Sequence, residues 1–164
     1  MKLIKFFSLI FSFMFLTSCN TDYLNVNNEN STNLNISSNE IFNISTKGLT
    51  LPKFKSLNDD ELLDIYAIDP NILVDYISNI SQENTSGVEI SIFHLKDKAN
   101  ANEVILGIQR RIEILENEFK NVKQSEYELI KNPYLNTLGN YVIFALHRDI
   151  KTFGNNLNNI FRIN

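Results

Sequence analysis

The sequence predicts an α+β domain in which a four-stranded antiparallel sheet, built from two hairpins, has helices packed on it. Three patterns support this prediction. Residues 88–95 alternate side chains in the manner of a strand. Residues 100–122 repeat apolar side chains every three or four positions, as one face of a helix does. Residues 141–147 form a second short apolar run directly after a Gly-Asn turn signal. The expected order of elements is α-α-β-β-α-β-β-α.

Composition limits the possible functions. The 164 residues are enough for one ordinary domain and a leader. Fifteen basic residues against 19 acidic ones give a net charge of −4, and no dense basic patch is present, so we expect no nucleic-acid partner. The single cysteine excludes an intramolecular disulfide and any metal centre that needs several cysteines. We expect no cofactor.

Residues 1–18 have the layout of a lipoprotein signal peptide. Lys2 and Lys5 begin the segment, an apolar run extends to Leu16, and small residues precede Cys19. The run is shorter than the roughly 18–20 residues that a membrane-spanning helix needs. The Leu-Thr-Ser-Cys ending resembles the bacterial lipobox, in which the cysteine thiol receives a lipid. We therefore expect lipidation at Cys19 and an extracytoplasmic protein on the outer face of the cell membrane, a plain signal peptide being the alternative.

Residues 19–47 predict an Asn-rich flexible tether. Nine asparagines lie between Asn20 and Asn43, and no helix or strand period persists over most of this segment. An edge strand over residues 36–44 is the alternative. The folded α+β domain is expected over residues 48–164.

The first half of this domain begins with helix-start signals. Asn58 is a good N-cap, and the acidic residues 59–61 that follow it suit the positive end of a helix. Asp69, followed by a proline, predicts a second helix start. A strand is expected from Tyr76, and the polar residues 82–87 predict the turn that joins it to the strand over residues 88–95.

The second half contains a long amphipathic helix. Asn100 and Glu103 have the spacing of a capping box at its start. Its apolar stripe is Val104, Ile105, Ile108, Ile112, Leu115, Phe119 and Val122. We expect strands over residues 127–131 and 141–147, and a last helix from Asp149.

The strand over residues 141–147 is apolar on both faces, so both faces require cover. The two long helices cover one face if they lie together. The other face is covered either by the early helices between residues 58 and 75 or by a partner. A face left open would be a binding surface.

Several short motifs together resemble a known family. They are Asp60-Glu61-Leu62 with Tyr66-Ala67-Ile68-Asp69, Asn84 to Phe93, Arg110-Arg111, and Gly139-Asn140-Tyr141-Val142. On these residues the chain resembles the uncharacterised bacterial lipoprotein family catalogued as domain of unknown function 4358. The resemblance covers about residues 57–161 and implies a secreted, lipid-anchored α+β domain with no assigned activity. Ala67 departs from the family, in which a glycine is expected at this position.

Few residues suggest chemistry. His94 and His147 each lie near the end of a predicted strand, and neighbouring strands would let them share a metal ion with a carboxylate. Ordinary hydrogen-bonded histidines are the simpler explanation, because the sequence contains no recognised metal-ligand spacing. Glu89 lies in an otherwise apolar strand. It is either solvent-facing, which is the plainer explanation, or a buried base or partner of Arg110 or Arg111.

We therefore predict a lipid-anchored, non-catalytic module that binds an envelope protein or peptide through an open sheet face or its hairpin turns. The alternative is a small hydrolase or metal-dependent enzyme that uses His94, His147 and Glu89. A carrier of small ligands would need a pocket of roughly 300–1,000 Å³, and nothing in the sequence indicates one.

Overall fold

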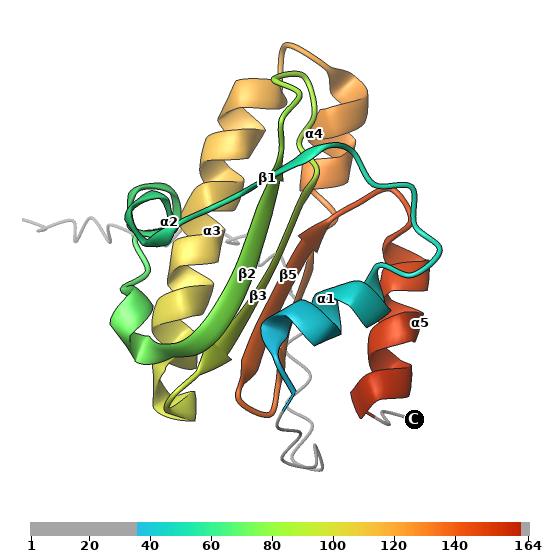
Figure 1. Cartoon of the computed structure of the whole chain (residues 1–164). Helices are drawn as coiled ribbons and strands as arrows, with labels where there is room; N and C mark the ends of the chain where they lie inside the picture. The colour runs from blue at the N-terminus through green and yellow to red at the C-terminus, as the bar shows by residue number, and fades with distance from the viewer. Residues whose placement is uncertain (1–35, 162–164) are drawn as a thin grey trace, which may run out of the picture.

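The computed structural model describes residues 36–161, in which one sheet lies between two groups of helices (Figure 1). Within these residues, no helix combines the length and the apolar character needed to cross a membrane. The helices are α1 (Ser38–Ser45), α2 (Asp59–Tyr66), α3 (Ala101–Phe119), α4 (Gln124–Ile130) and α5 (Ile150–Phe161). The strands are β1 (Phe54–Ser56), β2 (Leu73–Ser81), β3 (Glu89–Leu95), β4 (Tyr134–Leu138) and β5 (Tyr141–Leu146). Two short 3₁₀ turns, Pro70–Ile72 and Lys98–Asn100, precede β2 and α3.

The sheet has five strands in the order β1-β2-β3-β5-β4, with every neighbouring pair antiparallel. The α+β class, the antiparallel sheet and the hairpin β2–β3 are confirmed, and a second hairpin ends in β5 as expected, although its first strand is β4 rather than residues 127–131. The predicted count of four strands is wrong because the prediction did not include β1. Its three residues, with Lys55 and Ser56 exposed, are too few to show an alternating pattern.

The strand predicted over residues 127–131 is also wrong. Residues 127–130 lie in α4, with Lys131 as its C-cap, and the first strand of the second hairpin is β4, further along the chain. The buried side chains are Glu126, Leu129 and Ile130, which are three and four residues apart as on one face of a helix. The apparent alternation arose because the partly buried Tyr127 is two residues from Leu129.

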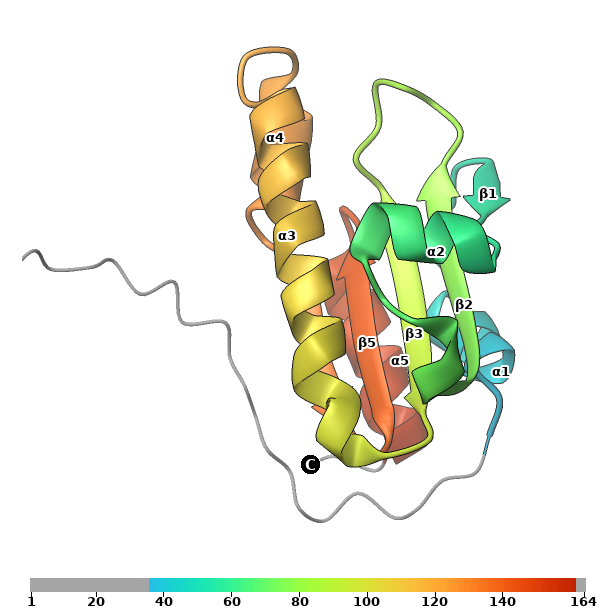
Figure 2. The ribbon, with the colours of Figure 1, turned by 90° about the vertical axis from the view of Figure 1, so that its left-hand side faces the viewer.

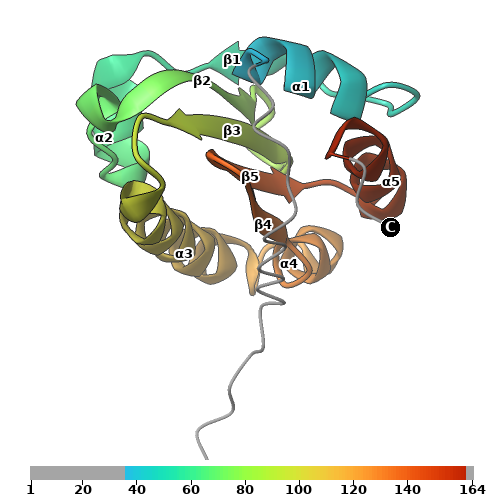
Figure 3. The same ribbon diagram turned by 90° about the horizontal axis from the view of Figure 1, so that it is seen from below.

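Both faces of β5 are covered, as its two apolar faces require. Val142, Phe144 and Leu146 belong to a core shared with α2, α3 and α4. Tyr141, Ile143 and Ala145 belong to a second core, shared with α1 and α5. Figure 3 shows the two groups of helices on opposite sides of the sheet.

The structure corrects the expectation about which segments provide this cover. The early helix α2 packs on the same side as α3, while the second face is covered by α1 and α5 (Figure 2). The two long helices therefore do not lie together. Within the described residues, the central strands β3 and β5 have no open face, so the predicted binding surface on an open sheet face is wrong.

The folded part begins earlier than residue 48. Ser37 caps α1 by accepting a hydrogen bond from the N–H of Glu40, and Ile41 is fully buried against the sheet. Residues 38–47 are therefore part of the fold rather than of a tether, and the alternative edge strand over residues 36–44 is not formed. The leader, Cys19 and the rest of the expected tether lie outside the described residues.

Both ends of α2 match the sequence. Asn58 accepts from the N–H of Glu61 at 3.0 Å, and Glu61 accepts from the N–H of Asn58 at 3.1 Å, which completes a capping box. Ala67 ends the helix in the left-handed region, with φ 53° and ψ 39°. Glycine reaches this conformation without steric cost. The glycine expected at this position from the family resemblance therefore has a conformational reason.

We expect Ala67→Gly to stabilise the folded chain by roughly 0.5–1 kcal/mol. Removing Cβ relieves a left-handed strain of about 1–2 kcal/mol, and the greater freedom of glycine in the unfolded chain offsets part of this gain. Urea unfolding of the full-length protein measures the change. Ala101→Gly, at a right-handed position with φ −57°, is the matched control and should lose up to about 1 kcal/mol. Loss of stability in Ala67→Gly would contradict the assignment of strain.

The long helix is confirmed with two corrections. The apolar positions from Val104 to Phe119 face the core, but Val122 lies beyond the end of α3 and is 73% exposed. The capping box predicted for Asn100 and Glu103 is absent, because Asn100 makes no side-chain cap. Asp97 instead caps the 3₁₀ turn that leads into the helix, accepting from the N–H of Ala99 at 2.9 Å.

Candidate functional site

His94 lies at the end of β3, on the side of the sheet covered by α1. Its Nδ1 is 3.3 Å from Asp75 Oδ2, and its ring stacks on Tyr141 at 4.3 Å between ring centroids. Asp75 also accepts from the N–H of Ser38 at 2.8 Å, and the Tyr141 hydroxyl donates to the Ile36 carbonyl at 2.6 Å. His94 is therefore part of a group of contacts that holds the start of the described chain against the sheet.

His147 follows β5 directly, and both of its ring nitrogens are engaged. Nδ1 accepts from the N–H of Asp149 at 3.0 Å, so the ring proton belongs on Nε2, which lies 3.2 Å from the Thr50 carbonyl oxygen. The ring joins the start of α5 to the segment between α1 and β1. With Nδ1 accepting and Nε2 donating, His147 has no free lone pair for a metal ion or for a proton from a substrate.

The strand register separates the two histidines. His94 pairs with Tyr141, whereas Glu89, five residues away on β3, pairs with Leu146 beside His147. At about 3.3 Å per residue, the histidines lie roughly 17–20 Å apart, too far to share an ion whose ligands each lie near 2 Å from it. Residues 36–161 contain no group of three or more His, Cys, Asp or Glu side chains that could hold a metal ion. The alternative in which His94, His147 and Glu89 share one site is therefore not supported by the fold.

Glu89 is buried, at 2% exposure, and faces α3 rather than solvent. Its carboxylate accepts from Arg111 Nε at 3.0 Å and from the Tyr66 hydroxyl at 3.0 Å. The Tyr66 hydroxyl is 3.2 Å from Ser91 Oγ, which is 2.8 Å from Ser78 Oγ. Burial, together with the charge of Glu89, raises the pKa of Tyr66 well above its usual value. The plainer solvent-facing explanation is wrong, and the partner is Arg111.

A second buried carboxylate, Glu126 on α4, was missed in the sequence. It accepts from the N–H of Gly87 at 2.9 Å and from the Arg148 guanidinium, and it is 3.3 Å from Lys123 Nζ. Burial raises the pKa of Glu126, but these three donors outweigh burial and hold it below its usual value. Lys123 also donates to the Thr85 carbonyl at 3.0 Å. The only signal in the sequence was Lys123, three residues before Glu126, which is the spacing of an ion pair on a helix. Because a strand was expected from residue 127, this helical spacing was not recognised.

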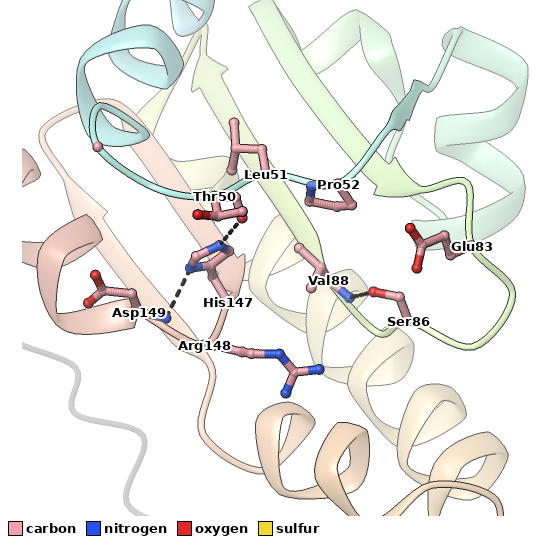
Figure 4. Close-up of a pocket in the computed structure, with 10 residues that line it drawn as sticks. Thr50, Leu51, Pro52, Glu83, Ser86, Val88, His147, Arg148 and Asp149 are labelled. Carbon is pink, nitrogen blue, oxygen red and sulfur yellow. Dashed lines mark hydrogen bonds between the residues drawn. The ribbon is translucent and has the colours of Figure 1, made fainter.

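A pocket of about 570 Å³ lies at the end of the sheet where β5 finishes, and its lining includes His147 and Arg148. Three separate segments form it: the connection between α1 and β1, the β2–β3 hairpin loop, and the residues that follow β5 (Figure 4). The lining residues are Gly48, Thr50, Leu51, Pro52, Glu83, Ser86, Val88, His147, Arg148 and Asp149. The volume lies within the range of roughly 300–1,000 Å³ typical of small-ligand sites.

The pocket lining includes Thr50, Ser86 and His147. The Nδ1 lone pair of His147 accepts from the N–H of Asp149, so it is not available as a base in this arrangement. Ser86 Oγ accepts from the N–H of Val88 at 3.4 Å. The remaining polar groups are the charged side chains of Glu83, Arg148 and Asp149.

A family model described as Domain of unknown function (DUF4358) matches residues 31–147, which is more than half of the chain. No curated protein and no solved structure matches the chain.

Proposed function

Because the chain belongs to the family described as Domain of unknown function (DUF4358), a description without an activity, we propose its role from its own residues. The protein is a lipid-anchored, non-catalytic binding domain of the cell envelope. It is held on the outer face of the membrane through Cys19 and presents the pocket between the β2–β3 loop and the end of β5 to an envelope component.

The observation that carries the anchoring is the position of the single cysteine. Cys19 directly follows the basic, apolar and small-residue segments of the leader, where a lipobox requires it. Two long acyl chains on this sulfur would anchor the protein stably, since each buried CH₂ contributes about 0.8 kcal/mol.

The arrangement of the folded part supports a binding role. The chain enters the described fold at Ile36, whose carbonyl accepts from Tyr141 at the start of β5. The pocket includes His147, just beyond the other end of the same strand. The entry of the anchored chain and the pocket therefore lie at opposite ends of β5, an arrangement that suits a ligand arriving from the side away from the membrane.

We do not retain the enzyme alternative, because His94, His147 and Glu89 do not come together in one site. No observation favours a particular reaction, while the pocket favours binding. Of the two binding surfaces expected from the sequence, the hairpin loop is retained, since Glu83 and Ser86 line the pocket.

The anchoring is tested by growing producing cells with labelled palmitate. We expect the full-length protein to carry the label and to be digested by a protease added to intact, wall-stripped cells. Cys19→Ala should abolish the labelling completely, because it removes the acceptor sulfur. Ser18→Ala, which keeps a small residue before the cysteine, is the matched control and should be labelled like the unchanged protein. An unlabelled parent protein, or equal labelling of Cys19→Ala, would refute the proposal.

A further inference from the structure

We infer that the pocket binds a short peptide with both termini free, its carboxylate on Arg148 and its ammonium group on Glu83. This inference rests on the proposed function and names the ligand class of the same site. It follows from how charge is distributed around the pocket.

Arg148 provides a positive charge on one side of the pocket, next to the Asp149 carboxylate. The buried carboxylate of Glu126 faces two cations, Lys123 and Arg148. The Arg148 side chain is 59% exposed, and one of its nitrogens, Nη2, is held by Glu126. No other partner of this guanidinium is found among residues 36–161. The rest of its donor fork can therefore take a ligand carboxylate, the planar anion that arginine binds best.

The loop side carries a carboxylate that is available to a ligand. Two hydrogen bonds order the loop around Glu83. The N–H of Glu83 donates to the side chain of Ser81, at Oγ, over 3.1 Å, and the carbonyl of Glu83 accepts from the N–H of Ser86 at 2.9 Å. Within the described part of the chain, the Glu83 carboxylate itself has no hydrogen-bond or ion-pair partner. Figure 4 shows it directed from the loop toward the pocket. Asp149, the other acidic lining residue, is engaged with the N–H of Thr152 at 3.1 Å.

Apolar residues also line the pocket. They are Leu51, Pro52 and Val88, and the remaining lining residues include Thr50 and Ser86. A simple anion would meet the carboxylates of Glu83 and Asp149, and a simple cation would meet Arg148. A peptide whose opposite terminal charges are separated by its backbone and small side chains satisfies both ends and covers the apolar part.

The test uses trialanine as the probe, in NMR titrations of the full-length protein in detergent. Trialanine amide lacks the carboxylate, and N-acetyl-trialanine lacks the ammonium group. We expect trialanine to bind, and each modified peptide to bind about tenfold more weakly, because each loses one charge-assisted contact. Arg148→Gln should bind trialanine and its amide equally, whereas Glu83→Gln should bind trialanine and its acetylated form equally.

Glu113→Gln, on the exposed side of α3, and Lys120→Gln, directly after the end of α3, are the matched controls and should leave all three affinities unchanged. If Arg148→Gln does not fold, the Glu83→Gln variant still tests the inference. Its substitution removes no contact within the described part of the protein, so we expect this variant to fold. Equal binding of trialanine and its amide by the unchanged protein would overturn the inference. Absence of trialanine binding at about 10 mM would overturn it too. Either result leaves the palmitate experiment, and hence the anchoring, untouched.

Discussion

Replacing Glu89 by alanine is expected to destabilise the fold by about 3 kcal/mol. The substitution leaves Arg111, whose side chain is 16% exposed, without its carboxylate partner in the core. Breaking a buried ion pair on one side costs roughly 3–5 kcal/mol, and the lower end applies because Arg111 can gain some water. The Tyr66 hydroxyl also loses an acceptor, although Ser91 Oγ remains 3.2 Å away.

Urea unfolding of the full-length protein measures this loss. Glu113→Ala removes an exposed glutamate two residues from Arg111 in the sequence and should change the free energy of unfolding by less than about 0.5 kcal/mol. The double variant Glu89→Leu with Arg111→Met should recover much of the loss, because a buried pair replaced by apolar side chains leaves no uncompensated charge. A loss below about 1 kcal/mol in Glu89→Ala would show that the pair contributes little to folding.

Gly107→Ala is expected to destabilise the fold by about 1–3 kcal/mol, although alanine is the better helix former. A Cβ at this position would lie 2.4 Å from the Tyr66 carbonyl oxygen, a backbone atom, and 3.1 Å from Ile68 Cγ1. To accommodate it, α3 and the end of α2 would have to separate, and this overpacking outweighs the gain in helix propensity of about 1 kcal/mol.

Gly154→Ala in α5 is the matched control for this prediction. Its Cβ would meet only the Tyr134 ring, at 3.5 Å, which is ordinary contact, so the helix propensity should raise stability by up to about 1 kcal/mol. Thermal unfolding of the two variants should therefore shift the midpoint in opposite directions, by several degrees each. A shift in the same direction for both would contradict the close approach of α2 to α3.

Local patterns predicted the elements whose neighbours along the chain decide their structure. The capped start of α2, the stripe of α3 and the strands β3 and β5 follow from side chains within a few residues of one another. The alternation around Glu89 even identified its strand, but the choice between solvent and an arginine partner depends on what covers that face. Patterns within a few residues do not show which helix covers the face of the sheet that carries Glu89.

The candidate site shows the same limit more sharply. Glu83, Arg148 and Thr50 come from segments distant in the chain, and none belongs to a recognisable motif. Two strand-end histidines looked compatible with one site, yet the antiparallel register of β3 and β5 places them at opposite ends of the sheet. Alternation predicts that a strand exists but leaves open which end of it meets which end of its neighbour.

The sequence by itself determined the α+β class, the first hairpin, the strand β5 and the need to cover both faces of β5, because these properties depend on composition and on the periodicity of nearby residues. The tertiary structure alone decided that α1 belongs to the fold, that α1 and α5 cover the second face, and that a charged pocket forms beyond the end of β5. These features depend on contacts between residues far apart in the chain, such as Tyr141 with Ile36 and His147 with Thr50. Their formation is set by how whole helices and strands pack together, which no local pattern specifies.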